Sequence, residues 1–204
     1  MPDFRTNIEQ YIQEQAAPAH KYGHQPRLYA LTREIAALTQ PSPTYDDDIV
    51  FAATFLHDLG VFVGHRPEDP EALKQWDHVA YTSEHAPGLL AFLGFPTEKI
   101  HAVIHCIHEH QPHDEPTTFE ATLLRDADIL EQLGAIGILR TAAKLGSDTR
   151  FLLFTNVQQS LQHTLETLPP KIKLDATREL AVPRMIALHS FLQSLAAEAG
   201  DHLG

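Results

Sequence analysis

The sequence predicts an all-α fold, and three observations support this prediction. Apolar residues recur at helical spacing in nearly every segment, as in QPRLYALTREIAALT at residues 25–39. No segment shows the apolar–polar alternation of a half-buried strand, and no internal repeat is visible. The chain has 204 residues, of which 43% are hydrophobic. This size and composition suit a single globular domain.

The first half of the chain is expected to form helices at 25–39, 47–58 and about 71–93, and another that opens at Pro96 and Thr97. Residues 46–48 are all aspartate, which favours a helix N-terminus at this point. The run IVFAATFL at 49–56 is apolar on all sides, so its helix is expected to be central and enclosed. Gly60 is expected to stop this helix, and Pro87 to bend the following one.

Helices are also expected in the second half of the chain. Thr117 and Glu120 have the spacing of a capping box and are expected to open a helix that runs through Leu130. Further helices are expected at about 138–145, 155–167 and 173–199. Pro183 is expected to start, kink or interrupt the last of them.

The charge and composition exclude several classes of partner. The net charge of −12 disfavours binding to a nucleic-acid polymer. No stretch reaches the ~20 apolar residues that span a bilayer, and the acidic, amphipathic N-terminus does not resemble a targeting peptide. The single cysteine, Cys106, fits a reducing cytoplasm. A phosphorylated small molecule would be repelled by this surface unless a divalent cation offset the repulsion.

Histidine is abundant, with 14 residues, and some histidines accompany aspartates. His57 and Asp58 follow the most apolar expected helix. Because neighbours on a helix diverge by about 100°, these two can converge on one cation only at a helix end or where both side chains swing inward. His24 begins another helix, and Asp126 and Asp128 lie in an otherwise apolar one, where unpaired carboxylates are costly. Two histidines and two aspartates suit a divalent or transition-metal ion.

The order H…HD…D resembles the HD-domain superfamily of metal-dependent phosphohydrolases. The run EATLLRDADILEQLGAIGILRT at 120–141 is similar to the signature of one bacterial branch of this superfamily. The resemblance also covers residues 20–27, the HD pair and FPTEKIHAVIHCIHEH at 95–110, and it continues through the tail. It implies an HD-domain helical bundle over residues 1–204, with a core at about 18–146 and a C-terminal helical extension at about 150–200.

The resemblance also implies a divalent metal, which could be Mn, Mg, Ni, Fe or Co. The implied ligands are His24, His57, Asp58 and Asp128, with Asp126 as the rival of Asp128. Residues two apart on a helix point about 200° away from each other, so both aspartates cannot ligate. The other one could orient a ligand histidine. A second metal would use His78 and His110, with His85 as the rival of His78.

The implied reaction is hydrolysis of a phosphate ester or anhydride in a phosphorylated small molecule, for which a nucleotide is expected. Residues expected to position water or protonate the leaving group are His20, His110 and Glu109. Residues expected to hold phosphate oxygens are Lys21, Arg27 and Arg140.

Two positions depart from the pattern of this branch. Lys21 stands where the branch has aspartate, and Ile129 stands where it has arginine, which removes a cation near the expected site. A di-iron oxygenase and a non-catalytic, metal-binding regulatory module are the alternatives to hydrolysis. The sequence also leaves open whether the exposed surface of the last two helices forms a homodimer.

Overall fold

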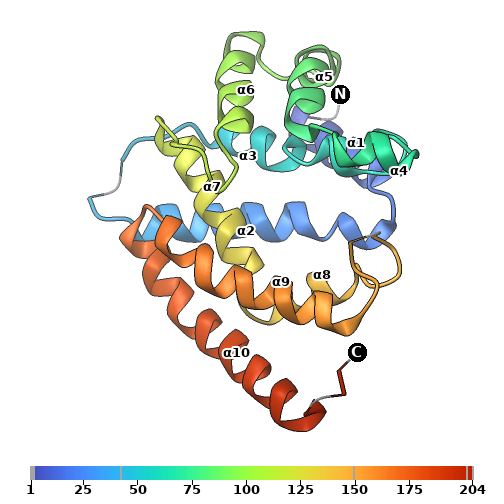
Figure 1. Cartoon of the computed structure of the whole chain (residues 1–204). Helices are drawn as coiled ribbons and strands as arrows, with labels where there is room; N and C mark the ends of the chain where they lie inside the picture. Colours follow the sequence, from blue (N-terminus) through green and yellow to red (C-terminus); the bar gives the residue numbers. More distant parts are fainter. Residues whose placement is uncertain (1–2, 42, 149, 201, 204) are drawn as a thin grey trace. The chain divides into compact units, whose positions relative to one another are not determined.

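The computed structural model describes residues 3–41, 43–148, 150–200 and 202–203, apart from the side chain of His20. These residues form ten α-helices and four short 3₁₀ helices, with no β-strand among them (Figure 1). The all-α prediction is therefore confirmed. The chain divides into two compact units, Met1–Arg125 and Asp126–Gly204. The division falls inside α7 (Phe119–Gln132), whereas the sequence places the end of the core at about residue 146.

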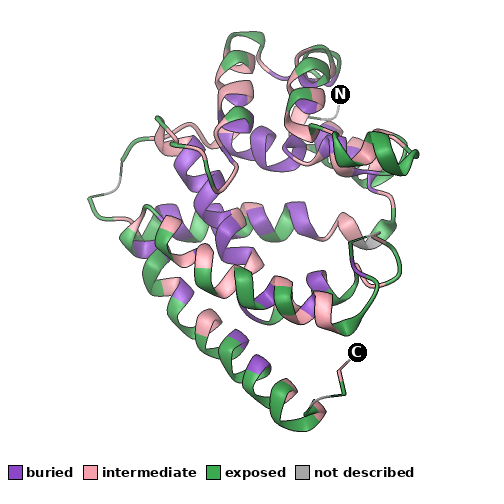
Figure 2. Cartoon of the chain, in the orientation of Figure 1, coloured by how far each residue is buried: buried purple, intermediate pink, exposed green. Residues whose placement is uncertain are grey.

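The first unit is built around α3 (Asp47–Leu56). Its other complete elements are α1 (Phe4–Gln15), η1 (Ala19–Lys21), α2 (His24–Leu38), η2 (Leu59–Val61), α4 (Pro70–Lys74), α5 (His78–Phe92), η3 (Thr97–Lys99) and α6 (Ile100–His108). Helices α1, α2 and α6 all pack against α3. Every residue from Val50 to Leu56 is buried, and Figure 2 shows α3 as an almost continuously buried helix. The enclosed helix expected from IVFAATFL is confirmed.

A cluster of ion pairs fixes the N-terminus of α3. The Asp46 carboxylate accepts a hydrogen bond from the Asp48 amide at 3.0 Å and so caps the helix. Arg5 of α1 donates to Asp47 at 2.8 Å and to Asp48 at 2.6 Å. Lys99 of η3 lies 2.8 Å from Asp46 and 2.9 Å from Asp48. These contacts join three elements at the helix end where carboxylates are favoured by the helix dipole.

The single helix expected over about 71–93 is wrong in one respect. The structure divides it into α4 and α5, with a break after Lys74. The Asp77 carboxylate accepts a hydrogen bond from the Ala80 amide at 2.9 Å and thus starts a new helix. Pro87 lies inside α5, which continues to Phe92.

The capping box expected at Thr117 and Glu120 is also wrong. The Thr118 hydroxyl accepts from the Ala121 amide at 3.1 Å, so Thr118 provides the side-chain cap of α7. The Glu120 carboxylate instead accepts from the Asp46 amide at 2.9 Å. The helix is therefore capped one residue later than expected, and Glu120 contacts another helix end instead of its own.

The second unit contains the rest of α7, together with α8 (Gly134–Ala142), α9 (Phe154–Thr167), η4 (Pro169–Lys171) and α10 (Asp175–Ala199). Helices α8, α9 and α10 pack against one another. Helix α8 starts four residues before the expected position. Gly134 supports this start with a φ of +75°, a conformation that other residues rarely adopt. Pro183 lies inside α10 without ending it. No described helix is long and apolar enough to cross a membrane.

Candidate metal centre

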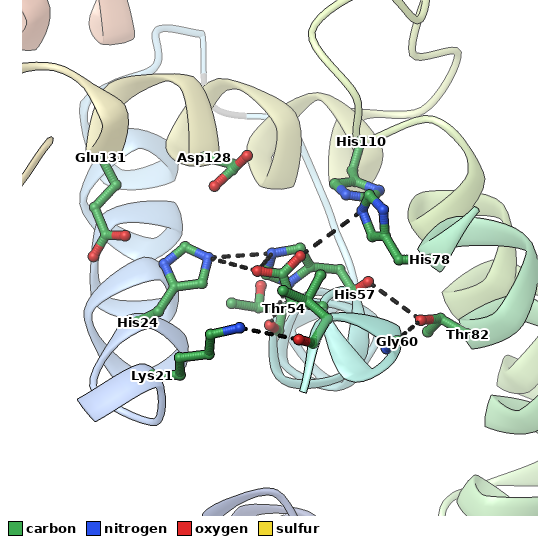
Figure 3. A network of polar contacts seen from close by, with 12 residues as sticks. Lys21, His24, Thr54, His57, Gly60, His78, Thr82, His110, Asp128 and Glu131 are labelled. Atoms are coloured by element: carbon green, nitrogen blue, oxygen red, sulfur yellow. Dashed lines mark hydrogen bonds and ion pairs between the residues drawn. The ribbon is translucent and has the colours of Figure 1, made fainter. Parts of the chain in front are cut away.

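His24, His57 and Asp58 form one group of potential metal ligands. His24 begins α2, and His57 caps the C-terminus of α3. The Nε2 atoms of the two histidines lie 3.3 Å apart. Asp58 Oδ2 lies 3.6 Å from Nε2 of His24 and 3.7 Å from Nε2 of His57. Figure 3 shows a ring nitrogen of His24 pointing toward the His57 ring, and the two rings are arranged edge to face. Three donor atoms from two elements therefore converge on one small region.

The end of α3 explains how neighbouring residues converge. The helix ends at Leu56, two residues before the expected end, and Asp58 has left the helical conformation at φ −98° and ψ 14°. His57 Nδ1 lies 2.8 Å from the carbonyl oxygen of Thr54. A carbonyl only accepts, so Nδ1 carries the proton and Nε2 presents its lone pair to the group. Backbone hydrogen bonding thus orients His57 as metal-binding histidines usually are.

Asp58 belongs to a second group with His78 and His110. His78 is the first residue of α5, and its Nε2 lies 3.9 Å from Asp58 Oδ1. His110 follows α6 and is 1% exposed, and its Nδ1 lies 2.6 Å from the carbonyl oxygen of Ile107. The two oxygens of Asp58 therefore face different histidines, Oδ2 the first group and Oδ1 the second.

The donor set fits a divalent cation. Burial by itself would raise the pKa of the Asp58 carboxyl, but the rings of His57, His24, His78 and His110 together hold it well below its ordinary value. Asp58 is therefore an ionised carboxylate that lies among the ring nitrogens of four histidines. Imidazole and carboxylate ligands together suit Zn, Mn, Fe, Ni and similar ions.

Comparisons with known proteins identify the fold. No family model and no curated protein matches the chain. The crystal structure of Bacillus subtilis YpgQ has a TM-score of 0.73 at 22% identity, and covers 97% of this chain and 96% of its own. YpgQ in complex with ADP has a TM-score of 0.72 at 23% identity, over 97% and 95%. A predicted HD superfamily hydrolase from an uncultured Thermotogales bacterium has a TM-score of 0.61 at 25% identity, over 97% and 91%.

The chain has an HD-domain fold. The helical bundle that the sequence resemblance implied is thereby confirmed. The more specific resemblance of residues 120–141 to one bacterial branch remains a prediction.

The structure separates His78 from its rival His85. His78 belongs to the second group, whereas His85 belongs to neither group among the described residues. The exposed His85 ring stacks on Tyr81, with ring centroids 3.9 Å apart. Its Nδ1 donates to the Tyr81 carbonyl oxygen at 2.8 Å. His85 is therefore a helix-surface residue that is held by its own helix.

Asp126 and Asp128 lie in the second unit, and they have different surroundings there. The fully buried Asp126 carboxylate accepts hydrogen bonds from the backbone amides of Lys173 at 3.1 Å and Leu174 at 2.8 Å. It thus holds the segment that leads into α10. Asp128 Oδ2 accepts from Gln132 Nε2, one turn further along α7, at 3.2 Å. Because Asp126 is engaged by these backbone amides, Asp128 remains the preferred ligand of the two. This assignment is still a prediction.

The residues expected to bind phosphate have mixed environments. Lys21 donates to the carbonyl oxygen of Val61 at 3.0 Å, and so joins η1 to the segment that follows Asp58. Arg27 is exposed on α2. In the second unit, Arg140 forms an ion pair with Glu131, a carboxylate that is only 1% exposed. Their roles toward phosphate stay predictions.

Two residues were expected to act in proton transfer besides His110. The side chain of His20 lies outside the described part of the chain. Glu109 accepts from the amide of Thr117 at 2.7 Å and lies 3.2 Å from His105 Nε2. Its carboxylate therefore fixes the loop between α6 and α7, and neither metal-ligand group includes it.

Sequence reasoning missed Gln111. Its side-chain nitrogen lies 2.9 Å from His110 Nε2 and 3.2 Å from His78 Nε2. The signal in the sequence is only that Gln111 follows His110 directly. That position does not reveal contact with a histidine 33 residues away.

Proposed function

We propose that the protein is a metal-dependent phosphohydrolase that acts on a phosphorylated small molecule, specifically a nucleotide. The observation that carries the proposal is the first group, in which two imidazole nitrogens and an ionised carboxylate converge at the end of a buried helix. A divalent cation held there would polarise a phosphoryl oxygen and lower the pKa of water. The HD-domain fold supports hydrolysis, because one structural neighbour is described as an HD superfamily hydrolase.

The residues of the chain have separate tasks in this proposal. His24, His57 and Asp58 hold the cation, and Asp128 completes the ligand set. The hydrogen bond from His57 to Thr54 keeps the Nε2 lone pair pointed at the group. Lys21 holds the backbone of Val61 and so positions the segment after Asp58.

Two observations support an anionic nucleotide as the substrate. The net charge of −12 repels phosphate on average, so binding needs a local positive charge, which the cation supplies. YpgQ, which shares the fold, has been crystallised with ADP. The expected reaction is cleavage of a phosphate ester or a pyrophosphate bond.

A second candidate function follows from Asp58, which belongs to both groups. A carboxylate with one oxygen facing each group suits two adjacent cations. Two irons in this arrangement would favour an oxygenase rather than a hydrolase. Finding two irons per chain, together with oxygen consumption that depends on substrate, would support this function.

The test is elemental analysis of the purified protein, followed by assays on nucleotides and phosphate esters with Mn, Mg, Ni, Fe or Co added. His57→Ala and Asp58→Ala are expected to lose both metal and activity while they retain helical circular dichroism. His113→Ala is the matched control, because the His113 side chain is 75% exposed. Full metal content in both site variants would overturn the proposal. Bound metal without turnover of any phosphorylated compound would favour a regulatory module.

A further inference from the structure

The amide of Gln111 lies between the two histidines of the second group. Its nitrogen is 3.2 Å from Nε2 of His78 and 2.9 Å from Nε2 of His110. An amide NH₂ group has two hydrogens and can donate one to each ring. The two nitrogen atoms that would bind a second cation therefore share one internal hydrogen-bond donor.

The hydrogen bonding of His110 determines which end of the amide faces the rings. His110 Nδ1 lies 2.6 Å from the carbonyl oxygen of Ile107, which can only accept, so Nδ1 carries the proton. With this proton placed on Nδ1, Nε2 is the ring nitrogen that accepts a hydrogen bond or binds a cation. The NH₂ group of Gln111 satisfies it, whereas the amide oxygen would place two acceptors in contact.

The backbone of Gln111 is held on both sides. The backbone N–H of Gln111 donates to the Asp114 carboxylate at 2.8 Å, and its backbone carbonyl oxygen accepts from Arg125 Nε at 3.2 Å. Arg125 is 2% exposed and also donates to the carbonyl oxygen of Pro112 at 2.9 Å. A buried guanidinium thus fixes the start of this loop. These backbone contacts therefore hold the Gln111 side chain beside His78 and His110.

We propose that Gln111 sets the affinity of the second group for a cation by competing for the lone pairs of His78 and His110. A cation and the amide hydrogens are both positively polarised, so they cannot share these lone pairs. Cation binding at Asp58, His78 and His110 requires the amide to withdraw and lose both hydrogen bonds. The described hydrogen bonds of the Gln111 side chain go to His78 and His110, so we expect Gln111 to act mainly on the second binding step.

This inference rests on the proposed function, because it assumes that the first group binds a divalent cation. In addition, the two groups bind their cations in order. The first group takes a cation at low concentration. The second takes one only when the concentration is high enough to displace the Gln111 amide. Gln111 thereby determines whether one or two cations are bound.

The test is a titration of the metal-free protein with Mn²⁺ alone, with bound and free ion counted by electron paramagnetic resonance. Gln111→Ala is expected to tighten the second binding step about tenfold, equivalent to about 1.4 kcal/mol, and to leave the first step within about twofold. Gln111→Glu, which keeps the shape and adds a carboxylate ligand, is expected to tighten the second step further. Gln10→Ala is the matched control, because Gln10 is exposed and contacts Glu14.

The outcomes distinguish this inference from the proposed function. His78→Ala should remove the second step and keep the first, which assigns the two steps to the two groups. A second step that weakens in Gln111→Ala would identify the amide oxygen as a ligand and overturn the inference, and an unchanged second step would overturn it as well. Both results leave the proposed function standing. Absence of any bound Mn²⁺ in the wild-type protein would overturn both.

Discussion

Gly60 packs its backbone against the backbone of His78. A Cβ atom placed on Gly60 would lie 2.8 Å from the carbonyl oxygen of His78 and 3.1 Å from its Cβ. Two hydrogen bonds fix this approach. Gly60 donates its N–H to the Thr82 hydroxyl at 3.1 Å, and its carbonyl oxygen accepts from the Trp76 indole at 2.8 Å. The segment after Asp58 is thus held against the start of α5, which places His78 beside Asp58.

We predict that Gly60→Ala destabilises the protein by about 1–3 kcal/mol, because the added methyl group overpacks a backbone contact. It should also weaken the second Mn²⁺ binding step, since α5 must move away from Asp58. Urea unfolding and the Mn²⁺ titration measure the two effects.

Gly88→Ala is the matched control for this substitution. Gly88 is exposed on α5, and no atom outside its immediate neighbours lies within 4 Å of a Cβ placed there. Alanine should therefore stabilise the helix, by up to about 1 kcal/mol. Equal stabilities of the two variants would contradict the close packing of Gly60 and His78.

The helices could be predicted from sequence because their signal is local. The apolar spacing in residues 25–39 predicts α2 to within one residue at each end. Gly60 shows the limit of such reasoning. We expected it to stop a helix, but α3 ends at Leu56, and Gly60 is required by the approach of His78, 18 residues further on. A contact between separate elements leaves no periodic signal in one sequence.

Some residues of the candidate site could also be predicted from local sequence, whereas others could not. His57 and Asp58 could be identified because two metal-binding residue types follow an unusually apolar helix. Gln111 could not, because its importance comes from ring nitrogens on two other positions of the folded chain. The Asp126 carboxylate was considered as a ligand, yet it accepts backbone amides from a segment 47 residues away. Such roles depend on tertiary placement rather than on residue type.

Asp126→Ala is expected to lower the free energy of unfolding by about 2–4 kcal/mol. The substitution removes a fully buried carboxylate and leaves the backbone amides of Lys173 and Leu174 without their charged acceptor. Metal content per folded chain should be unchanged. Thermal unfolding and elemental analysis together test this expectation, and loss of metal without loss of stability would contradict it.

Asp128→Ala is expected to have a different pattern, with lower metal affinity and a smaller loss of stability than Asp126→Ala. The hydrogen bond that Asp128 accepts from Gln132 lies within one helix, and its loss is expected to cost about 0.5–1.5 kcal/mol. Metal affinity is measured by the same Mn²⁺ titration. Wild-type affinity for the first ion in this variant would remove Asp128 from the ligand set.

Asp48 should make stability depend on acidic pH. Hydrogen bonds from Arg5, followed by those from Lys99, hold the pKa of its carboxyl below the ordinary value despite partial burial, which raises it. A lowered folded-state pKa stabilises the protein above the unfolded-state pKa of about 3.9, and this stabilisation is lost as the pH falls through the folded-state value.

Asp48→Asn is therefore expected to cost about 1 kcal/mol at pH 7, and the difference from wild type should shrink below about pH 4. Urea unfolding at pH 7 and pH 3 measures this change. Glu71→Gln is the control, because the Glu71 side chain is 79% exposed beside Lys74 and should contribute little. A difference for Asp48→Asn that stays constant with pH would show that its ion pairs do not stabilise the fold.

Cys106 should be almost unreactive in the folded protein. Burial raises the pKa of its thiol to about 12, Glu120 adds to the effect, and the residue is 1% exposed. Only the thiolate attacks a disulfide reagent, so labelling requires local or global opening of α6. We expect Ellman's reagent at pH 8 to react with the native chain at least about a hundredfold more slowly than with the chain in guanidinium. Cys106→Ala, which has no thiol, gives the blank rate. Native labelling as fast as that of the unfolded chain would show that α6 does not protect this position.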